Sequence, residues 1–245
     1  MTTQNEMIFG TRAVIEAIEA GKEIDKILIK KDLSSDLSRG LFAVLRDYDI
    51  PVQRVPMEKL NRLSRKNHQG VIAFISAVTY HRIADIVPQL YEAGKTPFIV
   101  VLDGVTDVRN FGAIARTCEC AGVDAIVVPV RGAAAVNADA VKTSAGALHT
   151  LPVCREHNLL ETIEFLKNSG IQIVAASEKA AQNYTEVDYS VPIAIVMGAE
   201  DLGVSPEILR ISDHIVSIPI RGNIESLNVS VAAGILIYEA LKARF

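Results

Sequence analysis

Short apolar runs and helical stripes alternate along residues 96–245 of the chain. Each run is nearly free of charge, which is typical of a strand buried on both faces. Because helical stripes separate the runs, the pattern predicts an α/β domain in which helices cover both faces of a parallel sheet. The expected strands are residues 98–102, 125–130, 171–176, 193–197 and 215–220. The expected helices are residues 111–121, 138–148, 159–169, 206–210 and 229–243.

Residues 1–77 carry a separate pattern, which predicts a small α/β unit. One expected helix covers residues 11–20, and a second, capped by Ser34 or Ser35, has an apolar stripe that includes Leu37 and Leu41. Strands are expected at 24–29, 52–55 and 71–75, with a short helix at 57–63. Residues 78–95 are expected to form a linker whose second half is a helix, 83–91, interrupted at Pro88. The predicted domains are therefore 1–77 and 96–245.

Composition narrows the class of protein. With 245 residues, 49% of them hydrophobic, the chain can bury a substantial core. We expect no membrane span and no signal peptide, and the odd set of Cys118, Cys120 and Cys154 is expected to be buried and reduced, as in a cytoplasmic protein. The five histidines lack ligand spacing, so no metal site is expected.

Charge is divided unevenly between the two predicted domains. The whole chain has a net charge of −4, but residues 1–77 carry twelve basic against ten acidic side chains. A local basic loop, NRLSRKNHQG, precedes the last strand of this unit. Such a loop is either a solvated turn or an RNA contact. Its candidate RNA-binding residues are Arg62, Arg65, Lys66 and His68.

The first polar loop of the second domain follows the strand at 98–102. It leads through Asn110, which is placed to cap the next helix, into a helix of small and apolar residues that also contains Arg116. A charged side chain is rarely buried without a partner. Arg116 is therefore expected either to pair with a carboxylate, such as Asp103 or Glu200, or to bind an anion in a cleft.

A second polar loop, Gly198-Ala-Glu-Asp-Leu-Gly203, follows the strand at 193–197. Its two glycines have the spacing of a phosphate-binding loop, but Val204 occupies the position of the essential lysine. No Gly-x-Gly-x-x-Gly follows any strand, which argues against a dehydrogenase or another ordinary Rossmann site. Glu200 is either a plain loop carboxylate or a substrate contact.

The third polar loop lies between the strand at 215–220 and the apolar helix at 229–243. Ser226, Leu227 and Asn228 stand at the entrance of that helix, where a serine or asparagine caps free N–H groups. Ligands of α/β proteins bind at such strand-to-helix loops. The triplet therefore has two readings, a helix cap and a ligand-binding loop.

Three segments in this order resemble the motifs of the SpoU/TrmH class of RNA ribose 2′-O-methyltransferases, in the SPOUT superfamily. They are NFGAIARTCECAGVDAIVVP, IVMGAEDLGVSPEIL and IPIRGNIESLNVSVAAGILIYEAL, and KTSAGALHTLPV matches a further family segment. The resemblance implies a parallel sheet with a deep trefoil knot, bound S-adenosylmethionine and a homodimer formed through the catalytic domain.

The resemblance also implies roles for individual residues. Arg116 would clamp RNA phosphate and stabilise the reacting ribose oxygen. Asn110 would orient Arg116 or the ribose, while Glu200 and Asn228 would hold the substrate and the loop. The implied catalytic residues are Arg116, Asn110, Glu200, Ser226 and Asn228. The implied cofactor-binding residues are Met197, Gly198, Ile218, Ile220, Ser226, Leu227 and Asn228.

Residues 1–77, including IFGTRAVIEAI and HQGVIA, are similar to the L30e-like substrate-binding domain of the ribosomal-RNA members. This two-domain arrangement favours guanosine in large-subunit (23S) rRNA as the substrate, with transfer RNA as the alternative. A catalytically silent RNA-binding protein of the same fold is a further alternative, and a methyl-transfer assay distinguishes it.

Overall fold

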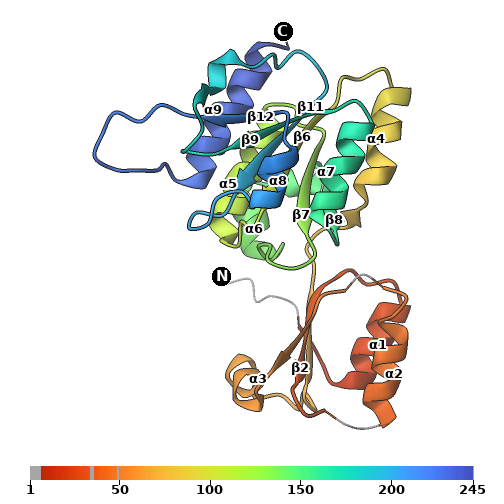
Figure 1. Ribbon diagram of the computed structural model, residues 1–245. Coiled ribbons are helices and arrows are strands. Elements are labelled where there is room, and N and C mark those ends of the chain that lie inside the picture. The colour runs from red at the N-terminus through yellow and green to blue at the C-terminus, as the bar shows by residue number, and fades with distance from the viewer. Residues whose placement is uncertain (1–6, 34–35, 49, 245) are drawn as a thin grey trace. The chain divides into compact units, whose positions relative to one another are not determined.

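The computed structural model describes residues 7–33, 36–48 and 50–244, which form two compact units (Figure 1). One unit contains the chain up to Thr79 together with Ala135–Ala138, and the other contains Tyr80–Ala134 and the chain from Asp139 onward. The expected linker does not appear as a separate segment. Strand β5 (Tyr80–His81) pairs with β8 (Val153–Glu156), and helix α4 (Ile83–Glu92) packs into the core of the second unit.

The N-terminal unit is a four-stranded mixed sheet in the order β1-β4-β2-β3. Its strands are β1 (Met7–Phe9), β2 (Ile24–Lys30), β3 (Val52–Val55) and β4 (Val71–Ile75). Helices α1 (Thr11–Glu19) and α2 (Asp36–Val44) cover one face, where Val14, Ile18 and Leu41 pack on the strands. The short helix α3 (Met57–Leu63) packs on the opposite face. The predicted cap at Ser34 or Ser35 lies outside the described residues.

The C-terminal unit is built on an eight-stranded sheet in which every neighbouring pair is parallel. The strand order is β10-β12-β9-β11-β6-β7-β8-β5. The strands not yet named are β6 (Phe98–Asp103), β7 (Ala125–Pro129), β9 (Gln172–Ala176), β10 (Gln182–Asn183), β11 (Ile193–Gly198) and β12 (His214–Ser217).

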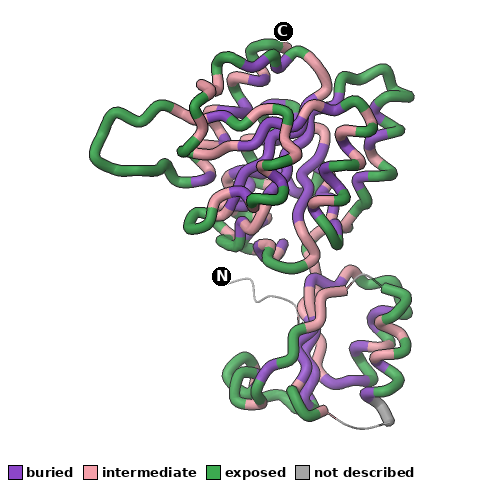
Figure 2. Tube along the Cα trace, viewed as in Figure 1, coloured by how far each residue is buried: buried purple, intermediate pink, exposed green. Residues whose placement is uncertain are grey.

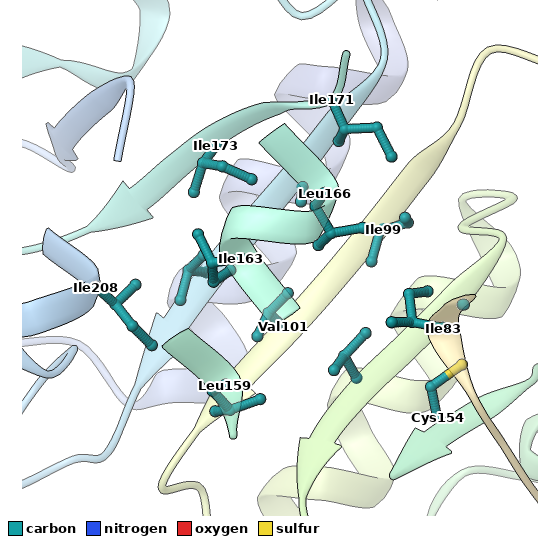
Figure 3. Close-up of a cluster of buried hydrophobic side chains, with 14 of the residues drawn as sticks. Ile83, Ile99, Val101, Cys154, Leu159, Ile163, Leu166, Ile171, Ile173 and Ile208 are labelled. Carbon is teal, nitrogen blue, oxygen red and sulfur yellow. The ribbon is translucent and has the colours of Figure 1, made fainter. Parts of the chain in front are cut away.

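Helices cover both faces of this sheet. On one side α4, α7 (Leu159–Asn168) and α8 (Pro206–Ile211) close a core in which Ile163 and Leu166 lie over Ile99 and Val101 (Figure 3). On the other side α5 (Val108–Cys120) packs against α6 (Ala138–Thr143) and α9 (Val229–Lys242). This is the two-sided parallel sheet that the apolar runs predict.

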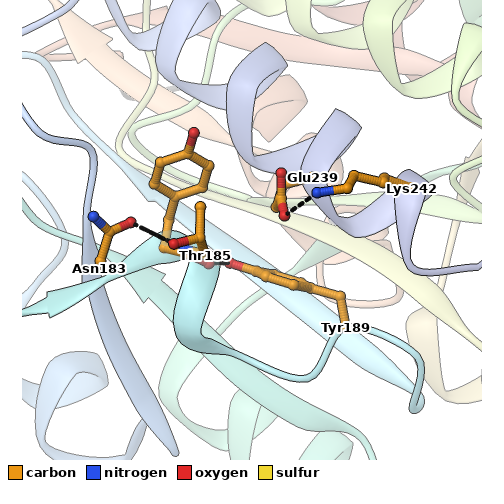
Figure 4. Close-up of polar contacts among 6 residues, drawn as sticks. Asn183, Thr185, Tyr189, Glu239 and Lys242 are labelled. Atoms are coloured by element: carbon orange, nitrogen blue, oxygen red, sulfur yellow. Dashed lines mark hydrogen bonds and ion pairs between the residues drawn. The ribbon is translucent and has the colours of Figure 1, made fainter.

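Helix α9 packs on one flank against the turn that follows β10. Tyr189 is buried there and donates a hydrogen bond of 2.8 Å to the Tyr184 carbonyl (Figure 4). Burial, with a smaller contribution from the nearby Glu239 carboxylate, raises the pKa of the Tyr189 phenol. Glu239 itself pairs with Lys242 at 3.3 Å on the helix surface.

Several sequence predictions differ from the structure. Helix α4 continues through Pro88, which lies on its exposed side. The helix expected at 138–148 is shorter and is followed by a separate 3-10 turn, Ala147–His149. Strand β12 ends at Ser217, so Ile218 and Ile220 belong to the loop. Two thiols are buried, and burial raises the pKa of Cys154 to about 12, but Cys120 is exposed on the outer side of α5.

Candidate functional site

Polar loops gather at the carboxyl ends of the central strands in the C-terminal unit. The strand order changes direction at β6, because β7 and β8 lie on one side of it and β11, β9 and β12 on the other. Loops diverge at such a switch point and leave a crevice, which is where open α/β sheets bind ligands. The three polar loops of the sequence follow β6, β11 and β12. The topology therefore brings two of them to the switch point and the third close by.

A pocket opens at this edge of the sheet. Its floor is the buried end of β11, and the other walls come from the ends of β9 and β12 and the start of α9. Six of the seven predicted cofactor-binding residues line it: Met197, Gly198, Ile218, Ile220, Ser226 and Leu227. The seventh, Asn228, directly precedes the lining residue Val229.

The loop after β11 folds back on itself at Gly198. Ala199 and Gly203 form a β-bridge, and a Cβ atom on Gly198 would lie 2.0 Å from the Gly203 carbonyl carbon. Only glycine leaves room for that approach. Beyond the bridge, the Ser205 N–H donates a 2.7 Å hydrogen bond to the Asp103 carboxylate at the end of β6. The loop that carries Glu200 is thus held at both ends.

Three predicted polar residues from distant parts of the chain form one network. Asn110 Nδ2 donates to Glu200 Oε1 at 2.9 Å, and Asn228 Nδ2 donates to the same oxygen at 2.8 Å. Asn228 Nδ2 also donates to Asn110 Oδ1 at 3.0 Å. The network ties the first turn of α5 to the entrance of α9 through one carboxylate. It leaves Glu200 Oε2 without a hydrogen bond to any described residue.

Asn110 is not the helix cap that the sequence suggests. Asp107 caps α5, because its carboxylate accepts hydrogen bonds from the N–H groups of Arg109 and Asn110 at 2.8 and 2.9 Å. The helix therefore starts three residues earlier than expected, at Val108. The Asn110 side chain is left free to face Glu200. The cap reading of Asn228 holds, since its Oδ1 accepts from the Ser230 N–H at 3.0 Å.

A second pocket adjoins the first. Its walls come from the β6–α5 loop and the loop after β11, and Asn110 and Asp107 lie in it. Ala199, Glu200 and Val229 line both pockets. Glu200 therefore lies between a mainly apolar pocket and a more polar one.

The loop at residues 218–227 forms the outer wall of the first pocket. It is exposed along most of its length (Figure 2), with Ile224 at 77% and Leu227 at 39% exposure. None of these ten residues makes a hydrogen bond or ion pair with any residue that the structure describes. The loop therefore presents free backbone N–H donors next to apolar side chains.

Arg116 is not brought into either pocket. It is exposed on α5, six residues beyond Asn110, or about 9 Å along the helix axis. It forms no ion pair or hydrogen bond with a described residue. Asp103 and Glu200, the carboxylates considered as its partners, are engaged elsewhere. Arg116 is therefore a solvent-exposed cation in the single chain.

The pocket also contains residues that the sequence did not single out. Ala176 ends strand β9, Ser177 and Glu178 follow it, and all three line the pocket. The available signal was their position, directly after a buried strand. They lie outside the three motifs, so motif spacing could not identify them.

The basic loop of the N-terminal unit divides into two kinds of residue. His68 is buried, with its Nε2 3.0 Å from Asn61 Oδ1 and its Nδ1 accepting from the Gly70 N–H at 3.1 Å. It therefore fixes the turn before β4. Arg62, Arg65 and Lys66 are exposed.

No group of three or more potential metal-ligating side chains occurs in the described part of the chain. Nor does any helix within those residues have the length and apolar character needed to cross a membrane.

Comparison with known proteins covers both units. Residues 97–238 match the SpoU rRNA methylase family, and residues 7–81 match the family described as RNA 2′-O ribose methyltransferase substrate binding. A Bacillus subtilis protein, YacO, described as a TrmH family tRNA/rRNA methyltransferase, is 32% identical over 244 residues, which are 100% of this chain and 98% of that protein.

Solved structures show the same likeness. The S-adenosylmethionine-bound rRNA methyltransferase from Sinorhizobium meliloti has a TM-score of 0.62 and 26% identity, covering 96% of this chain and 86% of its own. The A. aeolicus TrmH/SpoU tRNA modifying enzyme has a TM-score of 0.57 and 36% identity, and covers 66% of this chain and 84% of its own.

Proposed function

Because the chain belongs to the SpoU/TrmH family of S-adenosylmethionine-dependent RNA methyltransferases, we propose that it methylates the ribose 2′-oxygen of a guanosine in large-subunit ribosomal RNA. The observation that carries the proposal is the pair of pockets with Glu200 in their shared wall. One pocket suits the cofactor and the other a ribose. The substrate-binding family match at residues 7–81 supports an RNA substrate.

The residues of the first pocket fit S-adenosylmethionine. Its lining combines apolar side chains with a few polar groups, as is usual for small-molecule sites. Met197, Ile218 and Leu227 offer apolar contacts for adenine, and the free N–H groups of the 218–227 loop are available for its polar edge. Ser226 and Glu178 add polar groups for the ribose and amino-acid parts. When bound, this cofactor supplies a methyl group activated for attack by an oxygen nucleophile.

The polar network is proposed to position the RNA. In the second pocket, Asn110 and the free Oε2 of Glu200 would hold the ribose, with Oε2 accepting a hydrogen bond from the 2′-hydroxyl. Asn228 holds the Glu200 carboxylate in place through its own amide. Orientation of the attacking oxygen is a large part of the catalytic effect in such a transfer.

Arg116 is proposed to act in a neighbouring subunit. It faces solvent in the single chain, and no described carboxylate neutralises it. Beside α5, helix α9 exposes the apolar side chains of Val231 and Tyr238 at 51% each. We propose that this face forms a homodimer, which carries Arg116 to the partner's site. There the guanidinium would bind RNA phosphate and stabilise the reacting oxygen.

Arg116→Ala is expected to lower the single-turnover rate by about two to three decades, with S-adenosylmethionine affinity and Tm nearly unchanged. The reason is that Arg116 does not contact the cofactor pocket of its own chain. Rates on in vitro transcribed ribosomal RNA and calorimetric titration of the cofactor provide the two measurements. Glu119→Ala, at another exposed position of α5, is the control.

A mixture tests whether the site is shared. Arg116→Ala and Glu200→Ala proteins are each expected to have strongly reduced activity, but co-refolding them should restore part of the wild-type activity. A mixed dimer would contain one site with both residues intact. No recovery from demonstrably mixed dimers, or a monomeric wild-type enzyme, would contradict action across subunits.

The substrate assignment is tested by mapping. Ribosomal RNA from a deletion strain should lack one 2′-O-methylguanosine in the large subunit, and the purified enzyme should restore it. The S. meliloti rRNA methyltransferase matches 96% of the chain, whereas the A. aeolicus tRNA modifying enzyme matches 66%. This supports ribosomal over transfer RNA. If the deletion strain instead lacks a 2′-O-methyl group in transfer RNA, the proposed substrate is wrong but the proposed reaction is kept.

A further inference from the structure

One face of the N-terminal sheet is only partly covered. Side chains alternate along each strand, and the residues facing α1 and α2 include Ile8, Ile27 and Ala73. The opposite face contains Met7 and Phe9 of β1 and Phe74 of β4. Helix α3 buries part of this face, where Leu28, Val55, Leu60 and Ile72 are 0–3% exposed.

The remainder of this face is aromatic and half-buried. Met7, Phe9 and Phe74 pack against the residues that α3 buries and keep part of their side chains accessible. Met7 lies directly opposite Phe74 across the β1–β4 pair. Phe9, two residues further along β1, is therefore the diagonal neighbour of Phe74 on the same face. Such diagonal positions are about 7–8 Å apart. We call Phe9, Phe74 and the lysines above them the aromatic platform.

Each phenylalanine of the platform has a cation above its ring. Lys26, directly opposite Phe74 on β2, places its Nζ 5.3 Å from the Phe74 centroid. Lys66, in the basic loop, places its Nζ 5.1 Å from the Phe9 centroid. Neither ammonium pairs with a carboxylate among the described residues. Both are therefore free to bind an anion that approaches the rings.

This arrangement suits one ligand. Aromatic rings flanked by unpaired cations bind single-stranded nucleic acid, since the bases stack on the rings and the cations bind the phosphates. The diagonal spacing is about twice the 3.4 Å rise per nucleotide along one strand of a duplex. Both rings are therefore reached only by a strand whose bases are splayed apart. A regular duplex keeps its bases stacked inside and cannot use the platform.

We propose that the aromatic platform binds two unpaired nucleotides of the substrate RNA, one base on Phe9 and one on Phe74, with their phosphates at Lys26 and Lys66. The inference rests on the proposed function, because it takes the ligand to be the RNA that the enzyme methylates. It identifies one feature of the substrate as a loop or bulge with two unpaired nucleotides.

Phe9→Leu and Phe74→Leu test the platform in the full-length enzyme. Leucine keeps the apolar packing on α3 but removes the stacking surface. Each change is expected to weaken binding of a fluorescent single-stranded oligoribonucleotide by about 5- to 150-fold. Binding of a blunt duplex of the same sequence and of S-adenosylmethionine should not change. Phe74→Tyr should bind like the wild type.

Phe42→Leu is the matched control. Phe42 is a third phenylalanine of this unit with a cation above it, Arg54 at 5.3 Å, but it packs in the core on the α1/α2 face. Its replacement should leave RNA binding intact. Lys26→Gln and Lys66→Gln should weaken binding and each reduce the salt dependence, by about one phosphate contact.

Three results would overturn the proposal. Unchanged single-strand binding by both leucine variants is the first, and equal losses for single strand and duplex are the second. The third is a wild-type enzyme that binds no RNA. The proposed function fails as well only if this enzyme also transfers no methyl group. If methyl transfer is normal and the leucine variants bind RNA like the wild type, only the platform proposal is contradicted and the proposed function is kept.

Discussion

At the scale of single residues, the site requires glycine at position 198. The chain passes so close to itself there that a methyl group would overlap the backbone of Gly203 and Val204. The same turn places Glu200 between the two pockets. The close backbone packing at Gly198 therefore also determines where the Glu200 carboxylate lies.

Gly198→Ala is expected to lower stability by about 1–3 kcal/mol, since overlap in a packed site forces the backbone to move. It should also weaken S-adenosylmethionine binding at least tenfold, as the pocket floor shifts. Thermal unfolding and calorimetric titration measure the two effects. Gly222→Ala is the control, because Gly222 has no heavy atom within 4 Å of the added methyl group. Normal cofactor affinity in a folded Gly198→Ala protein would contradict this account.

The residue types at the site could be predicted, but one of their roles could not. Asn110 and Asp107 are both good capping residues, three positions apart, and propensity does not choose between them. The choice depends on Glu200, 90 residues away, which engages the Asn110 amide. For Arg116 the sequence offered a buried pair or a cleft, and the structure shows an exposed side chain.

At the scale of elements, helix α9 is fixed at both ends by side-chain hydrogen bonds. Asn228 caps its start, and Arg244, just beyond its end, donates to three backbone carbonyls. These belong to Thr96 and Pro97 before β6 and to Val191 before β11. The guanidinium also lies 4.7 Å from the Phe98 ring centroid. The helix is thereby tied to the amino ends of the two central strands.

Arg244→Ala is expected to destabilise the enzyme by about 1.5–3 kcal/mol, because it removes hydrogen bonds from a charged donor and leaves carbonyls unpaired. Urea unfolding should show a lower midpoint with an unchanged slope. Lys242→Ala, which removes only a surface ion pair with Glu239, should be nearly neutral. Equal stability of the two variants would show that the contacts of Arg244 contribute little.

Element prediction succeeded where periodicity was long and failed where it was short. The six-residue strand β11 was located within one residue, since a run of buried aliphatic residues is distinctive. The two-residue strands β5 and β10 are too short to show a period. Strand β8 was missed as well, because Arg155 and Glu156 break its apolar run. Its buried Glu156 is paired with Arg82, a contact that no local pattern reveals.

At the scale of the whole molecule, the two units have separate cores and separate chemistry. The aliphatic core of the N-terminal unit contains no residue from the central sheet of the other. The sequence pattern predicted domains at 1–77 and 96–245, and it could not predict that Ala135–Ala138 belongs to the first unit. The deep trefoil knot and the homodimer implied by the family resemblance stay predictions.

A protein that begins at Tyr80 is expected to fold and to bind S-adenosylmethionine with near-normal affinity, since every lining residue of the first pocket lies beyond that point. It should methylate structured ribosomal RNA poorly, because the substrate-binding family match is removed. Calorimetry measures the cofactor affinity and a turnover assay measures the methylation rate, both on the same preparation. Equal turnover by the full-length and shortened proteins would argue against a substrate-binding role for the first unit.

The shared wall of the two pockets has a thermodynamic consequence. Ala199, Glu200 and Val229 touch both spaces, so a shift of that wall on filling one pocket changes the shape of the other. Linkage requires such coupling to be reciprocal: the factor by which the cofactor alters RNA affinity equals the factor by which RNA alters cofactor affinity. Glu200 then couples the binding of the cofactor to the binding of RNA. The order in which the two bind changes the path but not the total free energy of binding.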